Sequence, residues 1–148
     1  MIQDYIKQFE LAELIAEEAH KGQIRKFGND KGKPYIVHPK RVANKLEPYF
    51  LKTISILHDV AEDTPIGFKE LKERGICAEV ITILSFVTKN HGENYLDFIK
   101  RIMTNEWAVR VKIADLQDNL ESCPEGQMKD KYRLALFILT ELTYDVGY

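Results

Sequence analysis

Residues 51–63 read LKTISILHDVAED, an apolar stretch that ends in His58, Asp59, Glu62 and Asp63. The apolar stretch predicts a helix, and side chains four positions apart lie on one face of a helix. His58 therefore lies over Glu62, and Asp59 lies over Asp63. Because unpaired charges in a core are costly, this ending is unusual for a helix that serves packing alone. One imidazole beside three carboxylates suits metal ligation and general-base catalysis.

Most of the remaining chain also shows helical spacing of its apolar residues. The stretch between residues 22 and 37 is instead a basic loop, broken by glycine and proline. No alternating strand pattern and no repeat is present. The sequence therefore predicts an all-α fold of about eight helices in a compact single domain, residues 1–148, with no further domain after it. The predicted helices cover residues 4–20, a segment from His38 to a stop at Pro48, and residues 50–63, 68–74, 78–88, 94–103, 107–122 and 128–144.

The bulk properties narrow the class of protein. A length of 148 residues allows one domain with a full-sized core. A net charge of −2 gives no reason to expect binding to nucleic acid or to an anionic membrane. No apolar run approaches the roughly 18 residues of a transmembrane helix, and the polar N-terminus does not resemble a signal peptide. Cys77 and Cys123 lack the spacing of a metal site, so both are predicted to be reduced thiols in a cytoplasmic protein.

Two further residues are candidate metal ligands, because a metal ion needs more than two protein ligands. His38 opens a predicted helix, and Asp115 interrupts an apolar helical pattern, with Asn119 four residues on along the same face. Each has a simpler interpretation: His38 as a residue at a helix end, Asp115 as the partner of Lys112, and residues 58–59 as an exposed helix end. The order His, His-Asp, Asp over three helices is more specific than any of its members.

Four segments carry this order: AHKGQIR at residues 19–25, PYIVHP at 34–39, LHDVAEDT at 57–64, and KIAD at 112–115 followed by Asn119. Together they resemble the HD superfamily of metal-dependent phosphohydrolases. Within it they are most similar to the hydrolase domain of RelA/SpoT enzymes and to the small alarmone hydrolases. The resemblance spans roughly residues 10 to 122 and implies the helical HD-domain fold.

The resemblance also implies roles for individual residues. It makes Glu62 and Asp63 the acidic pair that positions or deprotonates the attacking water. The metal is one divalent ion, typically manganese, although iron, zinc or cobalt also suits two imidazoles with two carboxylates. The implied metal ligands are His38, His58, Asp59 and Asp115.

Substrate contacts are implied on the same basis. Arg25 corresponds to the residue that brackets the purine, Lys26 to a position facing phosphate, Asn119 to a contact near the ribose, and Ser122 to a neighbouring polar contact. Lys112 is a weaker candidate for neutralising phosphate, and a salt bridge that orients the nearby aspartate is the alternative.

The segment after the last aspartate departs from the family pattern. The alarmone hydrolases usually carry Arg and His before the Asn, whereas this chain has Leu116-Gln117-Asp118. The charge of Asp118 would weaken polyphosphate binding unless its side chain points away. The leading hypothesis is hydrolysis of the 3′-pyrophosphate of guanosine alarmones. The alternatives are hydrolysis of another nucleotide or small phosphoester, and a non-catalytic module that senses nucleotides. The expected partner is a small nucleotide, and the oligomeric state is left open.

Overall fold

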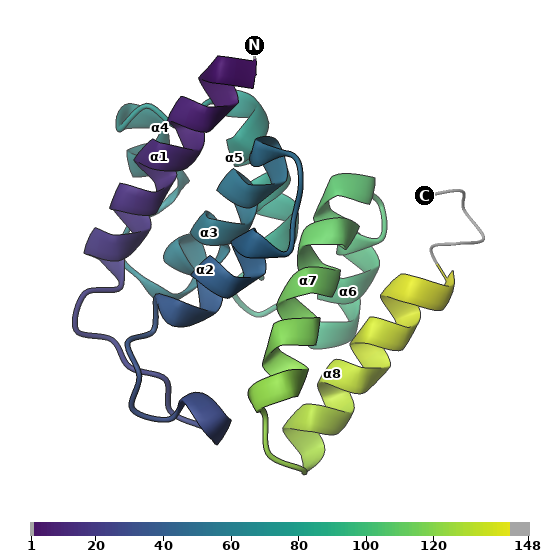
Figure 1. Cartoon of the computed structure of the whole chain (residues 1–148). Coiled ribbons are helices and arrows are strands. Elements are labelled where there is room, and N and C mark those ends of the chain that lie inside the picture. Colours follow the sequence, from purple (N-terminus) through teal and green to yellow (C-terminus); the bar gives the residue numbers. More distant parts are fainter. Residues whose placement is uncertain (1, 143–148) are drawn as a thin grey trace.

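The chain is all-α in the computed structural model, which describes residues 2–142 (Figure 1). Eight α-helices lie in this range, as the sequence predicts, and it contains no β-strand. A 3₁₀ turn at Gly28–Asp30 and a π-helical turn at Ile138–Leu142 complete the regular structure. The helices are α1 (Ile2–Ala19), α2 (Val37–Asn44), α3 (Tyr49–Asp63), α4 (Phe68–Glu73), α5 (Ala78–Val87), α6 (Tyr95–Ile102), α7 (Glu106–Ser122) and α8 (Gln127–Phe137).

The helix bounds match the predicted ones closely, with two differences. Helix α2 ends at Asn44, before the stop expected at Pro48, because the next two N–H groups bond to carbonyls three residues back and tighten the last turn. The last predicted helix changes at Ile138 into the π-helical turn. Its predicted end at Tyr144 lies outside the described residues.

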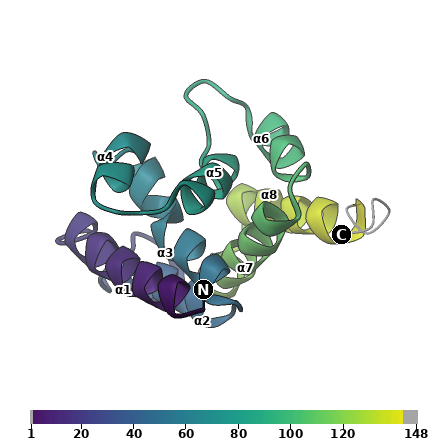
Figure 2. The ribbon, with the colours of Figure 1, turned by 90° about the horizontal axis from the view of Figure 1, so that it is seen from above.

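Helix α3 is the central element of the fold. All of its residues from Leu51 to Val60 are buried except Lys52, since α1, α2, α5 and α7 pack around it (Figures 1 and 2). Its buried hydroxyl groups are satisfied within the helix: Thr53 donates to the carbonyl of Tyr49 at 2.8 Å, and Ser55 to that of Lys52 at 2.9 Å. Burial on every side places the His58-Asp59 pair at the centre of the molecule.

Helix α7 joins two groups of helices. It contacts α2, α3 and α5 on one side and α6 and α8 on the other (Figure 2). Asn105 caps its first turn by accepting from the N–H of Ala108 at 3.0 Å, and Asn94 caps α6 in the same way. These contacts bring Asp115 of α7 against α2 and α3. No helix in the range 2–142 is both long and apolar enough to span a membrane.

The loop between α1 and α2 is held by its own backbone. Arg25 N–H donates to Lys33 O, and Gly32 N–H donates to Arg25 O, both at 2.9 Å. Gly28, at a φ of +71°, lies against the end of α7, where an added Cβ would come within 1.5 Å of the Ser122 carbonyl oxygen. Only glycine permits both this backbone conformation and this close approach. The loop is thereby docked beside α7.

Candidate functional site

Four side chains from three helices meet at the centre of the molecule. His38 comes from α2, His58 and Asp59 from α3, and Asp115 from α7, and all four are buried. Asp115 Oδ1 lies 2.9 Å from His38 Nε2 and 3.2 Å from His58 Nε2. Asp59 faces both imidazoles, with Oδ1 at 3.1 Å from His58 Nε2 and Oδ2 at 3.6 Å from His38 Nε2. The structure therefore brings together all four predicted ligands.

The arrangement of these donor atoms fits a divalent metal ion. Ligand atoms about 2.0–2.2 Å from one ion lie roughly 3–3.5 Å from each other, which is the spacing seen here. His38, His58 and Asp115 each place a ligand atom within 4.8 Å of the other two, and Asp59 borders this trio. Each imidazole uses its Nδ1 elsewhere, so that Nε2 faces the centre. Two imidazoles with two carboxylates suit several first-row divalent metals.

Electrostatic attraction shifts the pKa values of two of these groups, His58 and Asp115, in opposite directions. Burial alone would lower the pKa of His58, but the charges of Asp59 and Asp115 raise it to about 10. Burial would likewise raise the pKa of Asp115, but Lys112 and the two imidazoles hold it well below its ordinary value. Asp115 is therefore ionised and ready to bind a cation.

Tyr35 supports the centre from the loop before α2. Its hydroxyl donates to Asp59 Oδ2 at 2.8 Å, and its ring stacks on His20 with centroids 4.9 Å apart. His20 is buried and hydrogen-bonded to Gln23 Oε1 at 2.7 Å, which agrees with a packing role and not with a role as ligand. Tyr35 thus fixes the orientation of the Asp59 carboxylate.

Asp118 lies on the opposite side of the His38 ring from Asp115. It is buried behind His38, with Oδ2 2.6 Å from His38 Nδ1. Arg41 donates to its two oxygens at 2.9 and 3.0 Å and also binds Asp30. Burial would raise the pKa of Asp118, but the hydrogen bonds from His38 and Arg41 hold it well below the ordinary value. The repulsion of phosphate considered from the sequence therefore does not arise, because the charge faces inward and is neutralised.

Glu62 and Asp63 lie one turn further along α3 and reach solvent. Within residues 4–142, neither carboxylate makes a hydrogen bond or an ion pair, so both remain available to a ligand. Partial removal of water by the surrounding protein raises the pKa of each carboxyl group above its ordinary value, and the negative charge of Asp59 raises it further. A raised pKa makes a carboxylate a better proton acceptor at neutral pH.

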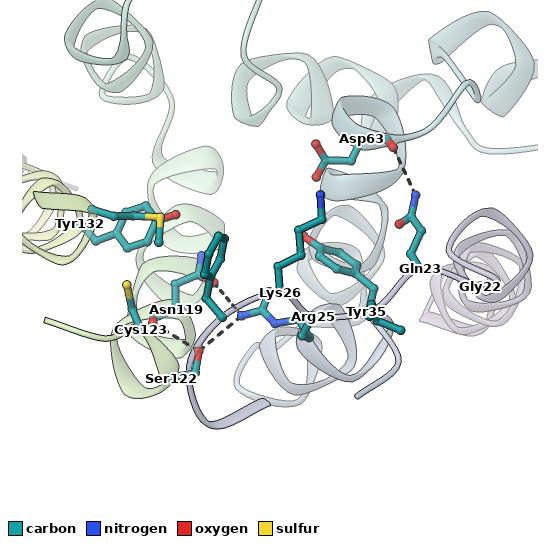
Figure 3. A pocket seen from close by; sticks show the side chains of 13 residues that line it. Gly22, Gln23, Arg25, Lys26, Tyr35, Asp63, Asn119, Ser122, Cys123 and Tyr132 are labelled. Carbon is teal, nitrogen blue, oxygen red and sulfur yellow. Dashed lines mark hydrogen bonds between the residues drawn. The ribbon is translucent and has the colours of Figure 1, made fainter. Parts of the chain in front are cut away.

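A cavity of about 630 Å³ opens next to the centre (Figure 3). None of the four donor residues lines it, but Tyr35 and Asp63 do, and these two flank the donors. The loop before α2, the end of α7 and the start of α8 form the other walls, with Met128 and Tyr132 coming from α8. A volume of this order suits a nucleotide-sized ligand.

Four of the five predicted substrate residues line this cavity: Arg25, Lys26, Asn119 and Ser122. Arg25 Nη2 donates to Asn119 Oδ1 at 3.3 Å and to Ser122 Oγ at 3.4 Å, and its guanidinium lies 5.5 Å from the Tyr35 ring centre. Figure 3 shows Lys26 extending to the side of the cavity where Asp63 lies. Two cations and one carboxylate, that of Asp63, therefore line the cavity, and this net positive charge favours an anionic ligand.

Lys112 lies outside this cavity. Its ammonium donates to Asp115 Oδ2 at 2.7 Å and is buried above the Phe98 ring at 5.5 Å. The structure therefore shows the salt bridge that the sequence offered as an alternative, and a contact from Lys112 to phosphate stays a prediction.

Sequence reasoning missed the residues that contact the predicted ligands from behind. Tyr35 was part of a recognised segment, but its hydroxyl was assigned no partner. Arg41 lies three residues after His38, and Asp118 three residues after Asp115, so helical spacing was a signal that each shares a face with a ligand. Only the packing of α2 against α7 shows that these faces meet.

Comparison with known proteins identifies relatives of this all-α chain with its buried His/Asp centre. No family model matches it. The bifunctional (p)ppGpp synthase/hydrolase SpoT of Escherichia coli K12 is 29% identical over 98% of this chain and 22% of the relative. The guanosine-3′,5′-bis(diphosphate) 3′-pyrophosphohydrolases of Haemophilus influenzae and Aquifex aeolicus are 31% and 32% identical, over 82% and 80% of this chain and 20% and 18% of theirs.

A solved structure of another protein has a similar fold. It belongs to a metazoan ortholog of SpoT described as hydrolysing ppGpp, and it matches with a TM-score of 0.68 at 22% identity. The match covers 93% of this chain and 84% of that one. The homologues of this chain are thus SpoT/RelA-type (p)ppGpp pyrophosphohydrolases, and the resemblance predicted from the four segments is confirmed. The chain spans only about a fifth of the length of these curated relatives.

Proposed function

We propose that this chain is a metal-dependent phosphohydrolase domain that removes the 3′-pyrophosphate of (p)ppGpp in the cytoplasm. The observation that carries the proposal is the convergence of four buried donor groups beside a cationic cavity. The curated homologues act on the same nucleotide, which supports this choice of substrate. The reaction adds water across the 3′-ester bond and yields GDP or GTP together with pyrophosphate.

The proposed ligands are His38, His58, Asp59 and Asp115, and the proposed ion is manganese, with iron, zinc or cobalt also chemically suitable. A bound divalent ion supplies Lewis acidity at a phosphate oxygen and lowers the pKa of bound water. Glu62 and Asp63 orient the attacking water and accept its proton, for which their raised pKa values prepare them.

The remaining residues hold the nucleotide. Arg25 spans the cavity between Tyr35 and Asn119, where a planar guanidinium can stack on a purine and keep its charge near phosphate. Lys26 neutralises phosphate charge on the side of Asp63, and Asn119 and Ser122 bond to the sugar. Binding the base and the phosphates at separate points places the 3′-ester bond near the acidic pair.

The experiment that tests the substrate is a turnover screen of manganese-loaded protein, with product identification. We expect ppGpp to give GDP and pyrophosphate, and the addition of EDTA to stop the reaction. Guanosine nucleotides without a 3′-diphosphate and simple phosphoesters serve as comparisons. If they are turned over while ppGpp is not, the alarmone assignment is wrong and the phosphohydrolase class alone survives. Binding of ppGpp without turnover would favour a sensing module.

Replacing Arg25 by alanine is expected to weaken nucleotide binding more than chemistry. The guanidinium contacts Asn119 and Ser122 across the cavity but none of the four donor groups. We therefore expect KM to rise by more than kcat falls, the pattern of lost ground-state binding. Steady-state kinetics on ppGpp measure both, and Arg133→Ala, a change to an exposed arginine of α8, is the control. A fall in kcat alone would place Arg25 in the chemical step.

A further inference from the structure

The two imidazoles of the centre are held from behind by different groups. His58 Nδ1 donates to the carbonyl oxygen of Ser55, a neutral acceptor within the same helix. His38 Nδ1 instead faces a carboxylate of another helix, Asp118 of α7, at 2.6 Å. Both His38 and Asp118 have 1% of their surface exposed, so water does not compete for this contact.

We propose that Asp118 is a positioning residue that makes His38 the stronger of the two imidazole ligands. This inference rests on the proposed metal centre. The Asp118 carboxylate accepts the proton that Nδ1 carries, so Nε2 is the nitrogen that faces Asp59 and Asp115 and would bind the ion. A carboxylate bonded to the far nitrogen fixes the ring orientation and raises the basicity of a ligating histidine.

Arg41 supplies the charge that makes this arrangement stable. An unpaired buried carboxylate would be costly, but Arg41 donates to both oxygens of Asp118 and Lys45 Nζ lies 3.7 Å away. Asp118 Oδ2 still accepts from His38 as well. Asp118 Oδ2 is thus a strong acceptor directed at His38. An ion pair that served only the packing of the helices would not need this contact.

The chain offers a matched control for this inference. Asp30, in the loop before α2, is also buried and also bonds to Arg41, but it does not touch His38. Asp118→Asn and Asp30→Asn each replace one of the two carboxylates that accept hydrogen bonds from Arg41. Only Asp118→Asn also changes the acceptor behind a ligand. The two variants therefore share the loss of a partner of Arg41, whereas an effect on metal affinity is expected of Asp118→Asn alone.

The test is calorimetric titration of Mn²⁺ into wild-type protein and both variants, with the free energy of unfolding measured without metal. We expect Asp118→Asn to bind Mn²⁺ about 10- to 100-fold more weakly, as outer partners of ligands typically do when changed. Asp30→Asn should keep the wild-type affinity. Equal affinity in all three proteins, or equal weakening in both variants, would overturn the inference. A wild-type protein that binds no Mn²⁺ would instead remove the proposed metal centre itself.

A second measurement does not depend on the folding of a variant. In wild-type protein loaded with Zn²⁺, which is diamagnetic, NMR of ¹⁵N-labelled histidines reads the Nδ1 proton of His38. We expect this proton to be shifted downfield and slow to exchange, because a buried carboxylate accepts it. A rapidly exchanging proton without such a shift would contradict the proposal.

Discussion

Replacing Asp115 by alanine is expected to abolish metal binding and turnover and to destabilise the metal-free protein. Its Oδ1 lies within 3.2 Å of both imidazole Nε2 atoms, so its loss removes the ligand shared by α2 and α3. Its Oδ2 pairs with buried Lys112 at 2.7 Å. Removing one partner of a buried ion pair costs about 3–5 kcal/mol, because the other charge stays buried. Chemical denaturation without metal, metal titration and ppGpp turnover measure the three effects.

The control for Asp115→Ala is Glu121→Ala, which removes an exposed carboxylate of the same helix. Surface pairs contribute little, so its unfolding free energy should stay within about 1 kcal/mol of the wild type. An Asp115→Ala protein that kept wild-type Mn²⁺ affinity would exclude Asp115 from the ligand set. One that lost metal without losing stability would show that Lys112 finds another partner.

A Glu62→Gln variant is expected to keep its metal and to lose about 10²- to 10⁴-fold in kcat, the usual effect of lost acid–base catalysis. Glutamine preserves the size of the side chain but cannot accept the proton of the attacking water. Glu62 lies one turn beyond His58, outside the four donors, so metal affinity should change little. Mn²⁺ titration and single-turnover kinetics on ppGpp separate these two outcomes.

Glu73→Gln, in the exposed end of α4, is the matched control and should retain the wild-type rate. Asp63→Asn shows whether the neighbouring carboxylate shares the task of proton transfer. A Glu62→Gln protein with full kcat would remove Glu62 from the mechanism. Loss of metal in this variant would instead make Glu62 a ligand.

The sequence by itself determined the helices and which residues share a face of each. Helical spacing is local, so the phase of His58, Asp59 and Glu62 on one helix follows from their numbers alone. The order of the four segments was enough to predict the relatives, and the four side chains that it singled out meet in the structure.

Only the tertiary structure decided which faces meet. Asp118 could have pointed toward phosphate or away from it, and the packing of α2 against α7 turned it onto His38 and Arg41. The same packing paired Lys112 with Asp115. The cavity needs the loop docked at Gly28 and the start of α8, elements distant in sequence. Contacts of this kind depend on how far and at what angle whole helices approach each other, which no local pattern of residues specifies.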